Sequence, residues 1–248
     1  MRSPAPTQPL SQPALQTDAT ELATYLRTLS VAEIARVMKV SPTLAQKTHE
    51  LYQSWLTSPE SAAIDSFVGD IYSGLRANTL TSDDRLYAAD RLRILSGLYG
   101  ILRPNDAIRQ YRLEMGYRLP ADQYRNLYAF WEQKIVNQIP ADQIIINLAA
   151  VEYSKVITPY VDAGRIIAPR FLTMHPVTKE PTFVVVHAKI ARGAFAHWLL
   201  RQRIDTPARL TEFMEIGYCY DESLSTSQEP VFVCQEFGGK GLSMRLER

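Results

Sequence analysis

The spacing of apolar residues predicts helices through the first quarter of the chain. Residues 17–29 (TDATELATYLRTL) have the period of a short amphipathic helix, and residues 30–38 (SVAEIARVM) have the period of a second. Ser30 and Glu33 are spaced as a capping box at the start of this second helix. Ser41 and Pro42 then begin a third helix, because serine caps a helix and proline fits its first position. We therefore predict a helical hairpin at about residues 30–56.

The later segments predict a mixture of helices and strands. We expect a short strand at 67–75 (FVGDIYSGL), and helices at 81–97, 121–139 and 190–204. Further strands are expected at 143–149, 165–172 and 182–188, and within 215–221 and 230–236. Four prolines among the first 13 residues indicate an extended lead-in over residues 1–17. Together these elements predict a mixed α/β fold in which residues 18–248 form one domain.

The charge balance limits the kinds of partner that the chain attracts. The formal net charge is only +1, although charged residues make up 21% of the chain. Proteins that attract nucleic acid through their overall field carry a clear basic excess, so any site for a polyanion must be local. No stretch approaches the ~20 apolar residues that span a bilayer, and the first residues lack the apolar run of a signal peptide. We expect a soluble, cytoplasmic protein with no membrane partner.

Signals for metal, nucleophile and cofactor chemistry are poor. The two cysteines do not form a CxxC pair, and free thiols are expected in a reducing compartment. No GxSxG, P-loop or GxGxxG motif is present. We therefore expect no metal and no cofactor, and we assign no catalytic residue. The histidines share no metal-ligand spacing; they are His49, His175, His187 and His197.

The helical hairpin has two interpretations. In a helix-hairpin-helix unit, the turn and the start of the second helix present backbone amides to a phosphate. Such contacts position a protein on DNA without reading bases, and Arg36, Lys39 and Lys47 would add positive charge. Lys39 stands where that unit usually has glycine, which weakens the match. The alternative is a pair of helices that only pack against each other.

The stretch 91–112 (RLRILSGLYGILRPNDAIRQYR) also has two interpretations. It holds five arginines and one acid, and a glycine-containing turn would bring Arg103 and Arg112 back toward Arg93. The flat fork of a guanidinium suits phosphate or carboxylate, so the stretch is a candidate anion site. The alternative is that the arginines pair with nearby acids, namely Asp90, Asp106 and Glu114.

A third group of polar residues follows the predicted strands. A carboxylate, a tyrosine and a lysine that face one crevice can do acid–base chemistry on a phosphorylated or nucleotide-like small molecule. The alternative is a satisfied network of ion pairs. The candidates are Asp70, Tyr72, Glu152, Tyr153, Lys189 and Arg192, with Asn147 beside them.

Five motifs, taken in order, resemble the YaaA peroxide-stress protein family of bacteria. They are FVGDIYSGL, RLRILSGLYGILRPNDAIRQYRLEMG, NLAAVEY, AKIARG and EIGYCYDES. The resemblance implies a single-domain mixed α/β fold with a central mixed sheet, flanking helices, a helix-hairpin-helix and a basic cleft. It also implies binding to double-stranded or branched DNA and a role in limiting iron-driven damage under hydrogen peroxide. Carried over to this chain, the hairpin falls on residues 34–45, and the cleft takes Arg93, Arg103, Arg112, Lys189 and Arg192. Together with the hairpin cations Arg36, Lys39 and Lys47, these are the candidate nucleic-acid-binding residues.

The chain departs from the family pattern near its start and near Ala150. Family members open with a strand and an SPAK-like segment, whereas this chain opens with MRSPAPTQP, so the first strand is expected to be missing or replaced. Ala150 stands where the family has serine. Our leading hypothesis is a DNA-binding protein of the peroxide response that holds the phosphate backbone. The alternative is an enzyme, and a third hypothesis, direct sequestration of iron, has no ligand motif behind it.

Overall fold

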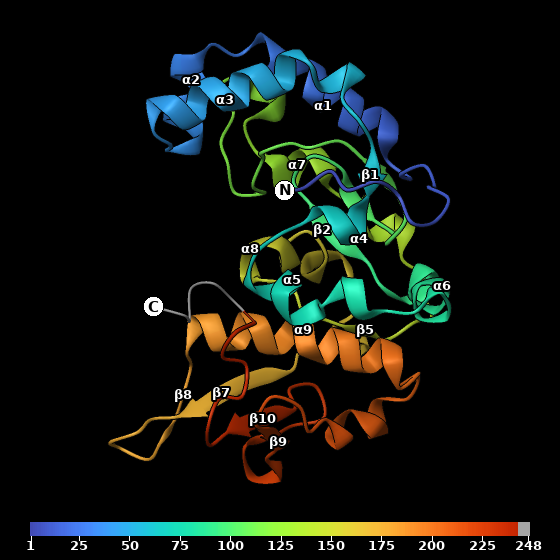
Figure 1. The fold of residues 1–248 in the computed structure, drawn as a ribbon, viewed down its shortest axis with the longest axis vertical. Helices are drawn as coiled ribbons and strands as arrows, with labels where there is room; N and C mark the ends of the chain where they lie inside the picture. Colours follow the sequence, from blue (N-terminus) through green and yellow to red (C-terminus); the bar gives the residue numbers. More distant parts are fainter. Residues whose placement is uncertain (243–248) are drawn as a thin grey trace. The chain divides into compact units, whose positions relative to one another are not determined.

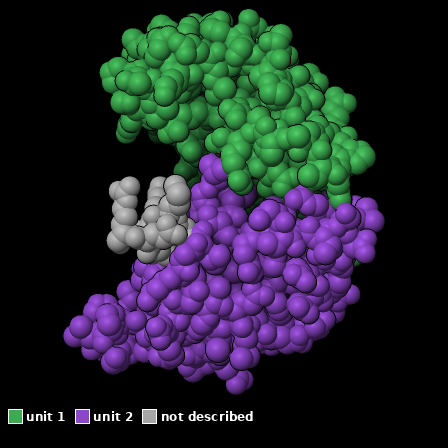
Figure 2. Space-filling model, in the orientation of Figure 1, with its two compact units in different colours: residues 1–66, 91–142, 149–161 green, residues 67–90, 143–148, 162–248 purple. Residues whose placement is uncertain are grey.

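The structure, a computed structural model, describes residues 1–242, and positions 243–248 of the expected domain lie outside the described residues. The described residues form two compact units, each assembled from three stretches of chain (Figure 2). Unit 1 contains residues 1–66, 91–142 and 149–161, and unit 2 contains residues 67–90, 143–148 and 162–242. Helices and strands occur in both units, which confirms the predicted mixed α/β class.

Unit 1 is mainly helical (Figure 1). Its α-helices are α1 (Gln16–Thr28), α2 (Val31–Met38), α3 (Pro42–Gln53), α4 (Ala63–Ser66), α7 (Leu127–Trp131) and α8 (Val151–Ser154). Its strands form two antiparallel pairs, β1 (Ser61–Ala62) with β4 (Ala107–Ile108) and β2 (Ile94–Ser96) with β3 (Gly100–Leu102). Its 3-10 helices are η1 (Trp55–Thr57), η3 (Asp122–Tyr124), η4 (Val136–Gln138) and η5 (Thr158–Tyr160).

Local signals set the ends of α2 and α3 as the sequence predicts. The Ser30 hydroxyl accepts the Glu33 N–H while the Glu33 carboxylate accepts the Ser30 N–H, so the capping box is complete. The Ser41 hydroxyl accepts the Leu44 N–H, and Pro42 occupies the first helical position. Between the two helices, Lys39 has left-handed backbone angles (φ 50, ψ 49) that let the chain reverse within three residues.

Lys39→Gly is therefore expected to raise the free energy of unfolding by about 0.5–1 kcal/mol. The left-handed conformation costs an L-residue roughly 1–2 kcal/mol, and the greater freedom of glycine in the unfolded chain offsets only part of that gain. Urea unfolding of the two proteins measures the difference. Lys47→Gly, in the interior of α3, is the control and should lower stability by about 1 kcal/mol. A lower stability for Lys39→Gly would contradict the prediction.

Unit 2 combines a four-stranded sheet with a long helix. Its α-helices are α5 (Asp70–Leu75), α6 (Ser82–Arg91) and α9 (Val185–Arg201), and α6 ends at the boundary with unit 1. The mixed sheet has the strand order β8 (Pro181–Thr182), β7 (Arg170–Met174), β10 (Val231–Cys234) and β9 (Tyr218–Tyr220). A separate parallel pair joins β5 (Ile145–Ile146) to β6 (Ile166–Ile167). Its 3-10 helices are η2 (Ala77–Thr79), η6 (Ala163–Arg165), η7 (Pro207–Glu212) and η8 (Glu222–Leu224).

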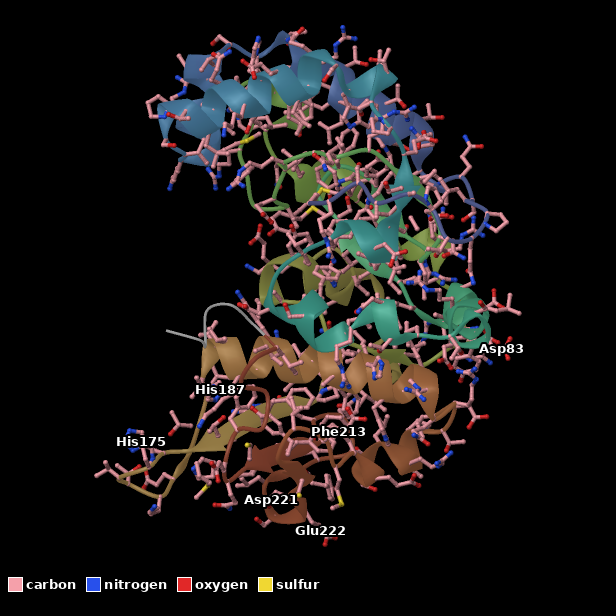
Figure 3. The ribbon with its side chains drawn as sticks, viewed as in Figure 1. Asp83, His175, His187, Phe213, Asp221 and Glu222 are labelled. Atoms are coloured by element: carbon pink, nitrogen blue, oxygen red, sulfur yellow. The ribbon has the colours of Figure 1, made fainter. Side chains whose placement is uncertain are left out.

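The core of unit 2 is aromatic and lies between α9 and the sheet. Phe171 on β7 stacks on Phe232 of β10, with ring centroids 5.4 Å apart. Phe195 of α9 lies 5.6 Å from Phe171. Phe213, labelled in Figure 3, is fully buried and contacts all three rings. Each such ring buries ~150–250 Å² on folding, so this cluster supplies much of the unit's hydrophobic stabilisation.

The other face of α9 packs against α5 at van der Waals distance through two glycines. A Cβ added at Gly193 would lie 1.8 Å from the carbonyl oxygen of Ile71, and one added at Gly74 would lie 2.0 Å from the carbonyl oxygen of Ile190. No side chain fits between two backbones that approach this closely. The two helices can therefore pack this closely only with glycine at both positions.

Several of the helices and strands that the sequence predicts, in both units, differ from those of the structure. Residues 70–75 form the helix α5 where we expected a strand, and the run expected as a strand at 182–188 contributes only Thr182 to β8 before α9 begins at Val185. The helix expected at 121–139 is divided among η3, α7 and η4, and the helix expected at 81–97 ends at Arg91 before β2. The single central sheet is not confirmed, because the strands of the described residues form four separate sheets.

Candidate functional site

The hairpin cations of unit 1 are exposed to solvent. Arg36 lies in the last turn of α2, Lys39 forms the turn, and Lys47 lies in α3. The first turn of α3 contains no acid, so its positive end is not neutralised by the chain itself. Within residues 1–242, Lys39 and Lys47 have no ion pair or hydrogen bond through their side chains. The hairpin thus offers a solvated, positively charged helix start.

Arg103 is held by a buried carboxylate. Its Nε lies 3.3 Å from Asp106 Oδ1, and its backbone N–H donates to Asp106 Oδ2 at 2.7 Å. The Asp106 side chain is 1% exposed, whereas that of Arg103 is 47% exposed. Asp106 also accepts the Ser11 hydroxyl at 2.7 Å. Of the two interpretations of the arginine stretch, pairing with an acid therefore applies to Arg103.

The other two predicted arginines of unit 1 have different surroundings. Arg93 is half-buried and donates to the carbonyl oxygen of Leu92 at 2.9 Å. Arg112 is half-buried, hydrogen-bonds to the Tyr117 side chain, and has an Nε that is buried without a partner. The carbonyl of Arg112 accepts the hydroxyl of the buried Tyr52 at 2.9 Å. Arg112 is therefore fixed through its backbone while its guanidinium keeps unused donor capacity.

Next to Arg112, two carboxylates and three phenols from three segments of unit 1 come together. We call this group the carboxylate–tyrosine cluster; its members are Glu114, Tyr117, Tyr128, Glu152 and Tyr153. The Tyr153 hydroxyl donates to Glu114 Oε2. Glu152 Oε1 accepts the backbone N–H of Gly116 at 2.7 Å. The Tyr128 hydroxyl donates to the carbonyl oxygen of Glu152 at 3.0 Å. Segments 36–39 residues apart in sequence thus contact each other residue by residue.

The electrostatics of the cluster keep its phenols protonated. Burial raises the pKa of Tyr153, and its hydrogen bond to the Glu114 carboxylate raises it further. Burial is the largest influence on the Tyr117 phenol and raises its pKa. The nearby charge of Arg112 lowers this pKa, whereas Glu114 and Glu152 raise it. Burial also raises the pKa of Tyr128, with Glu152 adding to it. The three phenols therefore stay neutral hydroxyl donors beside the side chains of Glu114 and Glu152.

In unit 2, the predicted cations Lys189 and Arg192 lie one turn apart on α9. Both side chains are half-buried. Burial lowers the pKa of the Arg192 guanidinium. No hydrogen bond or ion pair joins Arg192 to any carboxylate within the described residues. A half-buried guanidinium without a counter-ion is unfavourable unless an anion binds it, because its charge has lost part of its hydration.

The remaining predicted residues of unit 2 belong to α5 and β5. Asp70 is buried at the start of α5, and the Tyr72 ring stacks on Phe67 with centroids 5.2 Å apart. Asn147 follows β5, and its N–H donates to the carbonyl of Ile167 at 2.8 Å. The enzyme candidates are thus divided: Glu152 and Tyr153 lie in unit 1, and the others lie in unit 2.

A buried histidine network in unit 2 escaped the sequence analysis. Arg76 Nη2 lies 3.2 Å from His197 Nδ1 and 3.1 Å from Glu215 Oε2. Thr79 Oγ1 lies 2.9 Å from His197 Nε2. Because the guanidinium only donates, Nδ1 must accept, and Nε2 carries the proton toward Thr79. The imidazole is therefore a neutral, fully bonded link between α9 and the segment after α5.

Sequence reasoning also missed the full extent of the carboxylate–tyrosine cluster. It named Glu152 and Tyr153 as acid–base candidates and treated Glu114 only as a partner for arginines. Tyr117 and Tyr128 were not considered. The available signal was the motif RLEMGY (112–117), where two polar positions and a glycine alternate with apolar ones. Alternation of this kind presents one side of an extended segment to a partner segment.

Two features that are absent from the described residues bear on function. Within residues 1–242, no three His, Cys, Asp or Glu side chains come together in a group that could hold a metal ion. No helix in that part of the chain has the length and apolar character that crossing a membrane requires.

The fold and these side chains define a mixed α/β protein of two units with exposed cations on a helical hairpin. The family model described as "Peroxide stress protein YaaA" matches residues 1–224, and the chain belongs to this family. It is 60% identical over 238 residues to a UPF0246 protein of Salinispora tropica, which covers 95% of this chain and 90% of that protein. A UPF0246 protein of Roseobacter denitrificans is 37% identical over 235 residues, 91% of each chain. One of Burkholderia mallei is 37% identical over 236 residues, 90% of this chain and 89% of that protein.

Proposed function

We propose that this protein is a cytoplasmic DNA-binding protein of the hydrogen peroxide stress response, which holds the phosphate backbone and limits iron-driven damage. Its membership of the peroxide stress family supports the cellular role. The proposed phosphate contacts to double-stranded or branched DNA are the hairpin cations in unit 1 and, taken separately, Lys189 and Arg192 in unit 2. The contacts are mainly to phosphate, so the protein distinguishes sequences weakly.

The observation that carries the proposal is the exposed start of α3. Its first turn contains no acid, and Lys39 and Lys47 have no ion pair within the described residues. A phosphate placed at such a point meets both the helix dipole and the lysine charges. The half-buried Arg192 supports the same chemistry in unit 2, since it lacks a carboxylate partner in the described residues.

Replacing Arg36, Lys39 and Lys47 together with glutamine is expected to weaken DNA binding about tenfold or more at low salt. Each phosphate contact contributes about −0.9 to the slope of log K against log salt concentration, so the triple variant should lose about 2–3 units of slope. Fluorescence anisotropy with duplex and four-way-junction DNA over a salt series measures both quantities. The effect should be similar for different sequences.

The matched control removes the same charge from exposed ion pairs. Arg125, Arg170 and Arg209 pair with Asp122, Glu229 and Glu212, and surface pairs of this kind contribute little to stability. Their triple replacement by glutamine should change the slope by less than one unit if the hairpin is the site. Arg103 is unsuitable for such a test, because its loss leaves the buried Asp106 without its ion pair.

Two results would overturn the proposal. One is a folded wild-type protein that does not bind either DNA form at low salt. The other is a control variant that loses as much slope as the hairpin variant. The first result would favour the alternative, an enzyme acting on a phosphorylated or nucleotide-like small molecule.

A further inference from the structure

Residues 1–13, which we call the strap, are bound along unit 1 beside β1 and α4 (Figure 1). The strap contains no helix or strand of its own. The N–H of Arg2 donates to the carbonyl oxygen of Ser66, at the end of α4, at 2.8 Å. The hydroxyl of Ser61, in β1, donates to the carbonyl oxygen of Pro4 at 2.7 Å. The strap therefore keeps its course through hydrogen bonds to the rest of the unit.

Ser11 closes one side of the segment that forms β4. Its N–H donates to the carbonyl oxygen of Asn105 at 2.9 Å, and its carbonyl oxygen accepts the N–H of Ala107 at 2.7 Å. These two bonds make a parallel bridge between Ser11 and Asp106. On the opposite side, β1 pairs with β4, and the carbonyl oxygen of Asp106 accepts the N–H of Ala63 at 3.0 Å. Without Ser11, this edge of β4 would offer an unpaired donor and an unpaired acceptor to another chain.

A buried carboxylate fixes Ser11 at this edge. Asp106 is 1% exposed, and its Oδ1 accepts the Ser11 hydroxyl at 2.7 Å. Its Oδ2 accepts the backbone N–H of Arg103 at 2.7 Å, so the carboxylate is itself held in place. The Arg103 guanidinium also donates to the carbonyl oxygen of Gln12 at 3.3 Å. Hydrogen bonds to carboxylates are among the stronger ones in proteins, so the short bond from Ser11 to Asp106 is the main fastening of the strap.

The strap packs loosely between these fastenings. Residues 2–7 are exposed to solvent. An open cavity of about 400 Å³ lies along residues 10–13, which line it together with Gln16, Glu60 and Ala107. Segments with exposed residues and few apolar contacts open locally while the rest of a protein stays folded. The strap has both properties.

The bound strap also leaves one acceptor unsatisfied. The side-chain nitrogen of Asn105 donates to Gln8 Oε1 at 3.1 Å, but Asn105 Oδ1 is buried without a hydrogen-bond partner within residues 1–242. A buried acceptor without a partner costs free energy, and water reaches this one when the strap lifts. Opening therefore recovers part of the free energy that the broken hydrogen bonds contributed.

The sequence of the strap fixes the register in which it binds. Residues 9–13 read PLSQP, and only the three residues between the prolines carry a backbone N–H. A shift by one residue in either direction removes the Ser11 hydroxyl from Asp106, and a shift by two places a proline at the bridge. The same segment of a second copy would fit this edge with the same bonds. Exchange of identical segments is a low-cost route to dimers.

We propose that residues 8–13 are a detachable latch on unit 1, and that its opening exposes the edge of β4 as a docking site for the same segment of a second copy of this chain. The latch opens while β1 and β4 stay paired. The inference does not depend on the proposed contacts with DNA, so the two are tested separately.

Amide hydrogen exchange of the wild-type protein, followed by NMR, tests whether the latch opens on its own. The amides of Ser11 and Ala107 bond across the latch, whereas the amide of Ala63 bonds to the other side of the same segment. After correction for intrinsic rates, the first two should exchange about tenfold or more faster than Ala63. Equal protection of all three amides would show that the strap opens only when the unit unfolds, and would overturn the inference.

Ser11→Ala removes the bond to Asp106 and keeps the backbone bridge. It should speed exchange of the Ala107 amide about tenfold further and leave that of Ala63 unchanged. Ser3→Ala is the matched control, because Ser3 is an exposed serine of the strap without a side-chain hydrogen bond in the described part of the chain. It should leave both rates unchanged. An Ala107 amide that exchanges at the same rate with and without the Ser11 hydroxyl would contradict the role given to that bond.

A synthetic peptide of residues 6–13 stands in for the segment of a second copy. Carrying a fluorophore, it should bind the protein saturably in an anisotropy titration. It should bind the Ser11→Ala protein more tightly than wild type, since a latch that is open more often leaves the site free more often. The same peptide with Ser11→Pro lacks the N–H and the hydroxyl, and it should not bind. Equal binding of the two peptides, or binding of neither to the Ser11→Ala protein, would overturn the docking site.

Discussion

Replacing Gly193 with alanine is expected to lower the free energy of unfolding by about 3 kcal/mol or more, or to prevent unit 2 from folding. The added methyl group would lie 1.8 Å from the carbonyl oxygen of Ile71 and 2.6 Å from the backbone nitrogen of Leu75. Both obstacles are backbone atoms of α5, so no rotation of a side chain relieves the clash. The helices α5 and α9 would have to separate, which would expose the apolar surface between them.

Urea unfolding followed by circular dichroism measures this effect, and Gly74→Ala should resemble it because its methyl group meets the carbonyl oxygen of Ile190 at 2.0 Å. Ala196→Gly is the control. It removes one methyl group from the half-buried side of α9 and should lower stability by only about 1 kcal/mol, the difference in helix propensity. A Gly193→Ala protein within 1 kcal/mol of wild type would show that the close approach of the two helices is wrong.

Acid is expected to destabilise the protein by about 3 kcal/mol between pH 6.5 and pH 4 through His197. Burial, Arg76 and Arg201 lower the pKa of this histidine to about 4, and Asp84 opposes them weakly. Below pH 6.5 the unfolded chain takes up a proton that the folded chain does not bind. The stability contribution is therefore complete above about pH 6.5, and it falls by about 1.4 kcal/mol per pH unit until the folded pKa is reached.

The measurement is the free energy of unfolding of wild type and His197→Asn from pH 7.5 to pH 4.5. Asparagine keeps a donor and an acceptor for Thr79 and Arg76 but does not titrate in this range. The variant should be less stable than wild type at pH 7.5, and the gap should close as the pH falls. His187, whose pKa burial also lowers, adds a smaller loss to both proteins. Parallel curves for the two proteins would contradict the assignment to His197.

The sequence predicted the elements whose ends are decided locally. The helices α1, α2 and α3 follow from apolar spacing, the capping box at Ser30 and the Ser41–Pro42 start. The strands β9 and β10 follow from short β-branched and aromatic runs at the expected places. In the helices, neighbours within about four residues supply the deciding interactions. The strands β9 and β10 also need each other and β7 as pairing partners, although their positions follow from the local runs.

The errors fall where distant contacts decide. Residues 182–188 include three consecutive valines, which favour a strand, yet Val185 begins α9 because that helix fits between α5 and the aromatic core. Residues 70–75 form a helix because this segment packs against α9, with Gly74 in close contact with the backbone of α9. The carboxylate–tyrosine cluster joins segments 36–39 residues apart, and the pairing of Arg103 with Asp106 was one of two alternatives that composition left open.

The chain alternates between the two units along its sequence, and this order affects how the protein folds during synthesis. Residues 67–90 belong to unit 2, but the chain then returns to unit 1 and completes unit 2 only after residue 162. At ribosomal rates of 5–20 residues per second, α5 leaves the ribosome on the order of 10 s before the part of α9 that carries Gly193. During that interval the face of α5 that packs against α9 in the folded protein is exposed to solvent or to a chaperone. In nascent chains that are stalled before residue 185, α2 and α3 should therefore already be packed together, whereas α5 should not yet be packed against α9.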